Sequence, residues 1–255
     1  DALDRPELQI LSAQLVARQN GHYSVVGEVM NRDVDPADVT VSAYIYDDQA
    51  QLLTWYNAGA GMMHKLFPLE ITPFRIDFEG VAGLALKDAH EPVVFAPGET
   101  WDYTLPTDKK LGHYAVFAKA VVTQRDLNRE VGVQALKAIT TEAGLQLQGV
   151  LVNAGLREAV IPHLLVTLYD ETGRVVWVDH FFISESIRPQ RTLDVSVDLT
   201  ARQAIDLVEV EGDSYTNALD AVTGLSGPRQ DFLELPPDTG YQYLRVSVHY
   251  FAGEN

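Results

Sequence analysis

The chain of 255 residues contains no cysteine. Disulfide staples, thiolate metal sites and cysteine nucleophiles are therefore excluded. Basic residues are also scarce, since 19 lysines and arginines stand against 36 aspartates and glutamates, for a net charge of −17. A surface of this sign repels a phosphate backbone, so we expect no binding to nucleic acid.

Long apolar runs are missing as well. No segment approaches the roughly 18 uninterrupted apolar residues that a membrane helix requires. The most apolar run, 114–122, is broken by Lys119. The chain starts at Asp1 without an initiator methionine, which we interpret as a sequence whose signal peptide, lipid anchor or membrane tether has been removed. With the lack of cysteine, this favours an extracytoplasmic protein, secreted or held in the envelope or at the cell surface.

Catalytic motifs are absent too. The seven histidines form no His-x-x-x-His zinc pattern, and the sequence has no Gly-x-Ser-x-Gly elbow and no glycine-rich phosphate loop. Asp179 and His180 are adjacent, but neighbours on a strand point to opposite faces and cannot form a dyad. We therefore predict that the protein is not an enzyme. A hydrolase with a site between two domains is the least favoured alternative.

Apolar and polar residues alternate through most of the chain. The clearest alternating segments are 39–46, 192–199 and 244–249. This period of two is typical of strands with one buried face. Turn-forming pairs such as Asn20-Gly21 and Thr172-Gly173 separate the alternating segments. Short strands with frequent turns predict an all-β chain built as antiparallel, immunoglobulin-like β-sandwiches. Only 200–207 and 215–222 are compatible with short helical turns.

An internal repeat divides this pattern in two. Segment 25–31 matches segment 147–153, and segment 41–47 matches segment 164–170, at nearly constant separation. Matched features in the same order indicate duplication of one domain. The sequence therefore predicts two tandem sandwich domains, 1–124 and 125–255, with a polar boundary between them.

Two of the matched pairs predict packing. Gly27 and Gly149 lie inside strands, where glycine weakens the strand unless a bulge or a large side chain needs the room of the missing Cβ. Trp55 and Trp177 occupy matching places after the central strand of each copy. We expect both indoles to pack in the core or across strands, because an indole supplies much of the burial in a small sandwich.

Two further pairs predict turns. Asn31 and Asn153 each end a strand, where the amide side chain can bond the turning backbone. Asp47 and Asp170 open the turn after the central strand and are expected to act in the same way.

The motif around the second Tyr-Asp pair resembles a known family. Segment 166–170 reads Val-Thr-Leu-Tyr-Asp and is followed by Glu-Thr-Gly. With the strand from glycine to asparagine before it, the pattern resembles the FxLYD domain family. Segment 43–47, Ala-Tyr-Ile-Tyr-Asp, is a looser match, and Val166 and Ala43 stand where the motif has phenylalanine. The resemblance implies an immunoglobulin-type sandwich of prokaryotic envelope proteins, with a binding or structural role and no transferable functional residue.

One loop gathers acidic residues. Segment 31–38 carries Asp33, Asp35 and Asp38, and clustered carboxylates on a short loop are typical calcium ligands. The EF-hand spacing is missing, and the matching loop of the second copy has only Glu158. The sequence therefore predicts calcium as the candidate ligand of this loop and predicts no other cofactor. The alternative is a solvated loop that binds no ion.

One apolar segment has no counterpart in the second copy. Segment 59–67 carries Met62, Met63, Leu66 and Phe67. Exposed apolar loops usually mark contacts, so we predict that this segment closes over its own domain, packs on the second domain or binds a neighbouring subunit.

Val150 and Val152 give a second indication of contact, because they stand on the face of their strand opposite Leu147 and Leu151. The main hypothesis is a non-catalytic protein that mediates assembly or adhesion at the cell surface through protein partners or self-assembly. The alternative is a calcium- or glycan-binding module. That module would use the acidic loop and exposed aromatic residues such as Tyr44, Trp55 and Tyr56.

Overall fold

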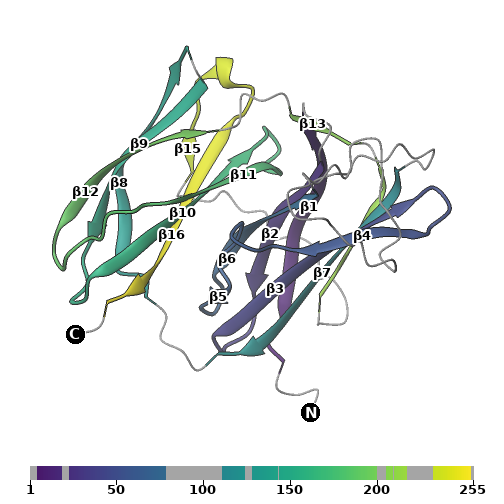
Figure 1. The fold of residues 1–255 in the computed structure, drawn as a ribbon, viewed down its shortest axis with the longest axis horizontal. Coiled ribbons are helices and arrows are strands. Elements are labelled where there is room, and N and C mark those ends of the chain that lie inside the picture. The colour runs from purple at the N-terminus through teal and green to yellow at the C-terminus, as the bar shows by residue number, and fades with distance from the viewer. Residues whose placement is uncertain are drawn as a thin grey trace, which may run out of the picture.

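The computed structural model describes residues 5–18, 23–78, 111–123, 128–142, 144–199, 205–208, 210–216 and 232–253. These residues form an all-β protein with four mostly antiparallel sheets (Figure 1). They contain no α-helix, only a short 3-10 turn at Pro237–Thr239. None of their helical segments is long and apolar enough to cross a membrane.

Two sheets are built mainly from the first half of the chain. Sheet A has the strand order β13-β1-β2-β6, and sheet B has the order β14-β7-β3-β4, with β5 paired to β3. Their strands are β1 (Leu8–Arg18), β2 (Tyr23–Asn31), β3 (Ala37–Asp47), β4 (Leu52–Asn57), β5 (Lys65–Leu66), β6 (Ile71–Phe78), β7 (Leu111–Val122), β13 (Ile205–Leu207) and β14 (Gly212–Tyr215).

The other two sheets belong to the second half. Sheet C has the order β12-β9-β8, and sheet D has the order β11-β10-β16-β15. Their strands are β8 (Val131–Thr141), β9 (Gly144–Asn153), β10 (Ala159–Tyr169), β11 (Val175–Phe182), β12 (Thr192–Leu199), β15 (Leu233–Glu234) and β16 (Tyr243–Ala252).

The strand order of the two halves is the same at its centre. Strands β1-β2-β6 of sheet A correspond in order to β8-β9-β12 of sheet C. Strands β7-β3-β4 of sheet B correspond to β16-β10-β11 of sheet D. Strands β13 and β14 cross this division, because they follow residue 200 in sequence yet pair with β1 and β7.

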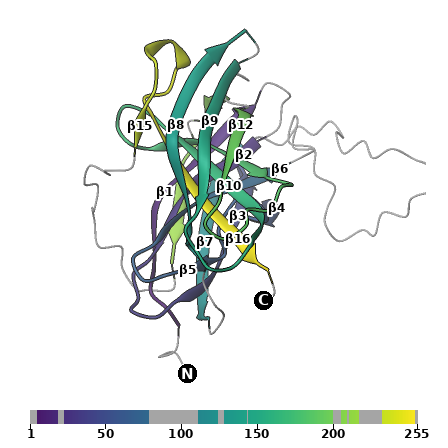
Figure 2. The same ribbon diagram turned by 90° about the vertical axis from the view of Figure 1, so that its left-hand side faces the viewer.

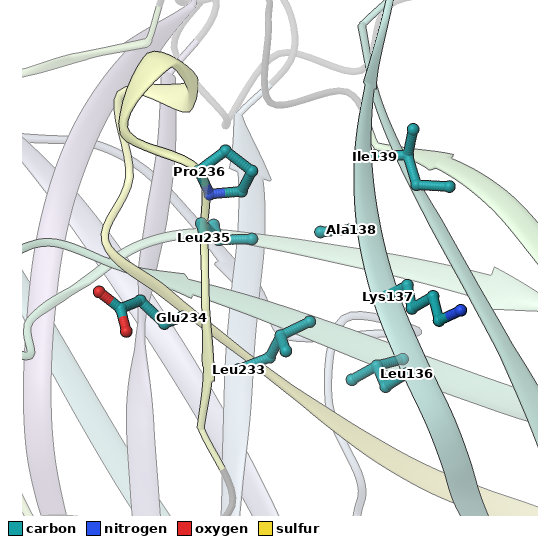
Figure 3. Close-up of a pocket in the computed structure, with 8 residues that line it drawn as sticks. All are labelled: Leu136, Lys137, Ala138, Ile139, Leu233, Glu234, Leu235 and Pro236. Carbon is teal, nitrogen blue, oxygen red and sulfur yellow. The ribbon is translucent and has the colours of Figure 1, made fainter.

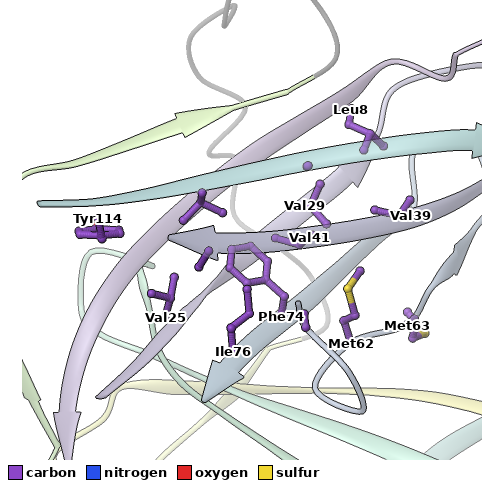
Figure 4. Close-up of a cluster of buried hydrophobic side chains, with 14 of the residues drawn as sticks. Leu8, Val25, Val29, Val39, Val41, Met62, Met63, Phe74, Ile76 and Tyr114 are labelled. Carbon is purple, nitrogen blue, oxygen red and sulfur yellow. The ribbon is translucent and has the colours of Figure 1, made fainter. Parts of the chain in front are cut away.

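Side chains from sheets A and B pack into one hydrophobic cluster. The predicted alternation is seen directly in β3, where Val39, Val41 and Ile45 are buried while Tyr44 points to the other face. Phe74 of β6 lies among the aliphatic side chains at the centre of this cluster (Figure 4).

Gly27 has the role that its place in the strand predicts. A Cβ on Gly27 would lie 2.5 Å from the ring of Phe74 and 2.1 Å from the carbonyl oxygen of Ser12. Gly149 differs, because a Cβ there would meet Val133 at 3.3 Å, which is tight but involves a side chain that can move. Opposite Gly149 the register of β8 shifts between Gln134 and Lys137, so this glycine faces a bulge, which is the other reason predicted for a glycine inside a strand.

The repeated asparagines bond the turning backbone as predicted. Asn31 donates from Nδ2 to the carbonyl four residues on, at 2.9 Å, and its Oδ1 accepts from the N–H two residues on, at 3.0 Å. Asn153 makes the same two bonds at 2.8 Å and 2.9 Å. Both side chains are fully buried.

The repeated aspartates also behave alike. Asp47 Oδ1 accepts from the N–H groups two and four residues on, at 3.0 Å and 2.8 Å. Asp170 Oδ1 accepts from the corresponding groups at 2.9 Å and 3.0 Å. Hydrogen bonds to Thr172 and Arg174 hold the pKa of Asp170 below its usual range, against the effect of its partial burial.

The four sheets lie in the order C, D, A, B across the molecule (Figure 1). Figure 2 looks from the side of sheet C and shows β8, β9 and β12 in front. Sheets C and D enclose further apolar clusters, which include Leu147, Leu151 and Leu164. The inner sheets D and A therefore face each other and are covered on both sides.

The contact between sheets A and D combines apolar packing with buried polar pairs. Tyr169 of β10 donates to Glu28 of β2, at 2.6 Å. Arg75 of β6 lies 3.3 Å from Asp179 and places its guanidinium 5.0 Å from the ring centre of Trp177. These side chains join two halves of the chain that the sequence predicts as separate domains.

Candidate interaction surface

Four aromatic rings cross the outer face of sheet B, one on each of its four neighbouring strands. They are Trp55 of β4, Tyr44 of β3, Phe117 of β7 and Tyr215 of β14, here called the aromatic row. The ring centres are 5.7 Å apart for Trp55 and Tyr44, 5.1 Å for Tyr44 and Phe117, and 4.7 Å for Phe117 and Tyr215. The strand register brings them together, because Tyr44 pairs with Trp55 and Phe117 with Tyr215.

The aromatic row is open to solvent. Trp55 is 50% exposed, Phe117 40% and Tyr215 44%. Val121, further along β7 on the same face, is exposed too. The corresponding tryptophan in the second half, Trp177, is only 3% exposed. These side chains form a contiguous apolar patch on the outer face of sheet B.

Polar groups lie beside the row. Tyr215 donates a hydrogen bond of 2.9 Å to Asp213, and this bond raises the pKa of the tyrosine. His113 Nε2 lies 3.3 Å from the same carboxylate. The surface therefore has an aromatic centre with charged groups at its border, which is the usual composition of a protein interface.

The rings of the aromatic row pack on one another in pairs. Trp55 and Tyr44 are stacked at an interplanar angle of 16°, and Phe117 and Tyr215 at 15°. The ring planes within each of these pairs are therefore nearly parallel, and Tyr44 meets Phe117 edge to face. Tyr56, named with Tyr44 and Trp55 in the glycan hypothesis, instead meets Phe78 edge to face.

The acidic loop uses its first aspartate to hold its own backbone. Asp33 Oδ2 accepts from Glu7 N at 3.0 Å, and Oδ1 accepts from Val34 N and Asp35 N. The bond from Glu7, followed by the one from Asp35, holds the pKa of Asp33 below its usual range.

Asp38 lies apart from that turn, in strand β3, where it pairs with Lys65 and Val121. Across the described ranges, no three histidine, aspartate or glutamate side chains come together as a metal site. Calcium binding by Asp33, Asp35 and Asp38 remains a prediction.

The apolar segment 59–67 closes over its own sheets. Met62, Met63 and Leu66 are buried in the cluster between sheets A and B. Phe67 remains partly exposed and lies under the guanidinium of Arg129, 5.6 Å from ring centre to Cζ. Arg129 also bonds Glu70, so this segment contacts the polar stretch between the two halves.

Val150 and Val152 lie on the outer face of sheet C and are half-buried. Of the residues singled out from the sequence for a protein contact, these two valines and Phe67 therefore keep accessible surface. Phe117 and Tyr215 were missed. Alternation along β7 could have placed Phe117 beside Lys119 on an exposed face, but nothing near Tyr215 in sequence indicates its pairing with β7.

A groove runs between β8 and β15 (Figure 3). Its charged side chains, Lys137 and Glu234, come from opposite walls, and the other lining residues are apolar. The lining contains no nucleophile paired with a base. The lining residues are Leu136, Lys137, Ala138, Ile139, Leu233, Glu234, Leu235 and Pro236.

Three histidines that are far apart in sequence meet on the face of sheet D that points to sheet A. His163 Nδ1 contacts His249 Nε2, and the His180 ring lies 5.6 Å from the His163 ring. Burial is the main cause that lowers the pKa of His163 to about 3 and that of His249 to about 4. Burial likewise lowers the pKa of His180. At neutral pH all three rings are uncharged.

Comparison with known proteins identifies no family. No family model matches the sequence, and no curated protein matches it. Among solved structures, a calcium-binding mutant of Bacteroides uniformis β-glucuronidase 2 aligns with a TM-score of 0.21 and 12% identity, over 97% of this chain and 28% of that one. Red sea bream transglutaminase aligns with a TM-score of 0.19 and 10% identity, over 74% of this chain and 27% of that one. The chain spans little more than a quarter of the length of these proteins, and the likeness is distant.

Proposed function

We propose that this is a non-catalytic, extracytoplasmic structural protein that mediates assembly or adhesion at the cell surface. Its contact surface is the outer face of sheet B. The observation that carries this proposal is the aromatic row, where Trp55, Phe117 and Tyr215 are 40% to 50% exposed on one face. Burial of such rings is a common source of binding energy in protein interfaces.

The architecture under this proposal is a pair of immunoglobulin-like sandwich domains of FxLYD type, derived from one duplicated domain. Sheets A and B make the first sandwich, and sheets C and D the second. The repeated strand order supports the duplication. The matching hydrogen bonds of Asn31 and Asn153, and of Asp47 and Asp170, support it at the level of single side chains.

The lack of cysteine gives a direct test, because one introduced thiol is the only site for a thiol-reactive probe. Val121→Cys places a benzophenone photo-crosslinker beside the aromatic row. Val34→Cys, on an exposed loop, is the control. The labelled full-length chain is irradiated alone and with surface and secreted proteins of the source cells.

We expect covalent products from position 121 that position 34 does not give and that Phe117→Asp abolishes. Circular dichroism and the melting temperature of Phe117→Asp show that the variant is folded. No product from position 121, or identical products from both positions, would overturn the proposal.

A further inference from the structure

The contact inside the molecule joins two different kinds of sheet. Sheet A packs on sheet D through the faces that carry Val26 on β2 and Val178 on β11, both fully buried. In strand order, sheet C is the counterpart of sheet A, and sheet B is the counterpart of sheet D. The contact therefore uses one sheet of each kind and leaves one of each kind, B and C, as the outer layers.

The two outer faces are not covered within the described part of the chain. Strands of sheet B contact only strands of sheets A and B in more than isolated pairs, and strands of sheet C contact only those of sheets C and D. Sheet B presents the aromatic row. Sheet C presents Val150 and Val152, which occupy the places that Glu28 and Met30 hold in β2 of sheet A.

Among the described residues, the outer faces of sheets B and C lack a counterpart of the buried polar pair, Tyr169 and Glu28, that joins sheets D and A. Tyr46 of β3 is the counterpart of Tyr169 of β10. In a contact between sheet B and sheet C, Tyr46 would meet Val150, which is the counterpart of Glu28. An aromatic ring against a valine forms an apolar contact that needs no buried carboxylate. Such a contact can open without leaving an unpaired buried charge.

Lys119 gives one border of the aromatic row a charge opposite to that of sheet C, whereas Asp213 at the β14 end of the row has the same sign as sheet C. Sheet C exposes Asp194 and Asp198 along β12, on the same face as the valines. Sheet B exposes Lys119 on β7 beside the aromatic row. Opposite charges at the border of an interface help to fix its register.

We propose that the aromatic row is covered by the outer face of sheet C from a second copy of this chain, repeating the contact between sheets A and D. This rests on the proposed function of sheet B as a protein-contact surface. Because the two faces differ, every added copy leaves one sheet B and one sheet C free. The contact therefore builds an open stack and not a closed dimer.

The net charge of −17 opposes this assembly at low salt. Copies repel one another over the Debye length, which falls from about 30 Å at 0.01 M salt to about 8 Å at 0.15 M. The stack is therefore expected to grow as salt is raised from low to physiological concentration, the reverse of an interface held mainly by ion pairs.

Sedimentation velocity of the full chain, from micromolar to near-millimolar concentration, tests the stack. The wild type should give species that grow stepwise with concentration. Phe117→Asp damages only the face of sheet B, and Val150→Asp damages only the face of sheet C. Each variant alone should associate at least about tenfold more weakly than the wild type. Unchanged melting temperatures show that both are folded.

Mixing the two variants gives the decisive measurement. The intact sheet C of Phe117→Asp can bind the intact sheet B of Val150→Asp, so the mixture should form a dimer that grows no further. A wild type that stays monomeric, a wild-type dimer that does not grow, or growth of either variant alone as strong as that of the wild type would overturn the stack. If the wild type is monomeric while position 121 crosslinks to another protein, the proposed function stands and only the stack falls.

Discussion

Tyr169 of β10 donates a hydrogen bond of 2.6 Å to Glu28 of β2, across the contact between sheets D and A. Both side chains are almost completely buried, and Arg245 lies 3.7 Å from the same carboxylate oxygen. A buried carboxylate needs such donors, because desolvation without them is costly. This pair therefore fixes how the two halves meet.

We expect Tyr169→Phe to lower the free energy of unfolding by about 1–3 kcal/mol, because Glu28 loses a buried donor. Chemical denaturation measures the change. Tyr46→Phe, at the matching place on the outer face of sheet B, is the control and should stay within about 0.5 kcal/mol. Equal effects of the two changes would contradict a structural role for the bond between Tyr169 and Glu28.

Stability should fall on acidification below neutral pH because of the buried histidines. The folded-state pKa is about 3 for His163 and about 4 for His249, below the unfolded value of 6.5. As pH falls below 6.5 the unfolded chain takes up protons that the folded chain does not, so stability is complete above this value and declines toward the folded pKa. For His163 alone the loss is about 2 kcal/mol at pH 5. The groups that act on the cluster are His64, Arg75, Asp77, Arg129 and Asp179.

The melting temperature between pH 7.5 and pH 5 tests this dependence. His163→Phe removes one titrating ring and keeps a ring to stack on Phe182, which lies 4.1 Å from it. The decline should be shallower in this variant whatever its stability at pH 7.5. A slope that does not respond to His163→Phe would assign the acid sensitivity to other groups.

Local patterns predicted most of the strands and turns. Alternation identified β3, β12 and β16, and the repeated Asn31 and Asn153 were expected to bond the turns that they do bond. These features depend on residues close in sequence. The prediction of a short helical turn at 200–207 was wrong in part, because residues 205–207 form strand β13, which pairs with β1.

Features that depend on how the sheets stack were not predictable. Trp55 and Trp177 were both expected to pack in the core or across strands, and both do. The sequence could not tell that Trp55 would stack on Tyr44 and stay half exposed while Trp177 is buried beside Arg75. The difference arises because the two indoles lie on different faces of their sheets: Trp55 pairs with Tyr44 on the outer face of sheet B, whereas Trp177 pairs with Leu168, the counterpart of Ile45, on the inner face of sheet D. The contact of His163 with His249 depends in the same way on the register of β10 and β16.

The two repeated asparagines should be equally important for stability. Each fully buried asparagine holds its loop through two hydrogen bonds of 2.8–3.0 Å, so Asn31→Ala and Asn153→Ala leave the carbonyl and N–H partners of these bonds without them. We expect each to lower the free energy of unfolding by about 2–4 kcal/mol. Asn57→Ala, an exposed residue that accepts one bond from Ser42, should cost less than about 1 kcal/mol. A large cost at only one of the two buried positions would weaken the case that they are equivalent.

Gly27 should tolerate no side chain. A Cβ at this position would lie 2.1 Å from the carbonyl oxygen of Ser12 in the neighbouring strand, and that backbone cannot move without breaking the pairing of β1 with β2. We therefore expect Gly27→Ala to destabilise the protein by about 2 kcal/mol or more. Gly132→Ala is the control, since a Cβ there meets nothing within 4 Å, and it should be neutral or stabilising by up to about 1 kcal/mol. If Gly27→Ala melts at the wild-type temperature, β1 and β2 can separate locally without cost, and the close approach of Phe74 to Gly27 does not hold sheet A in place.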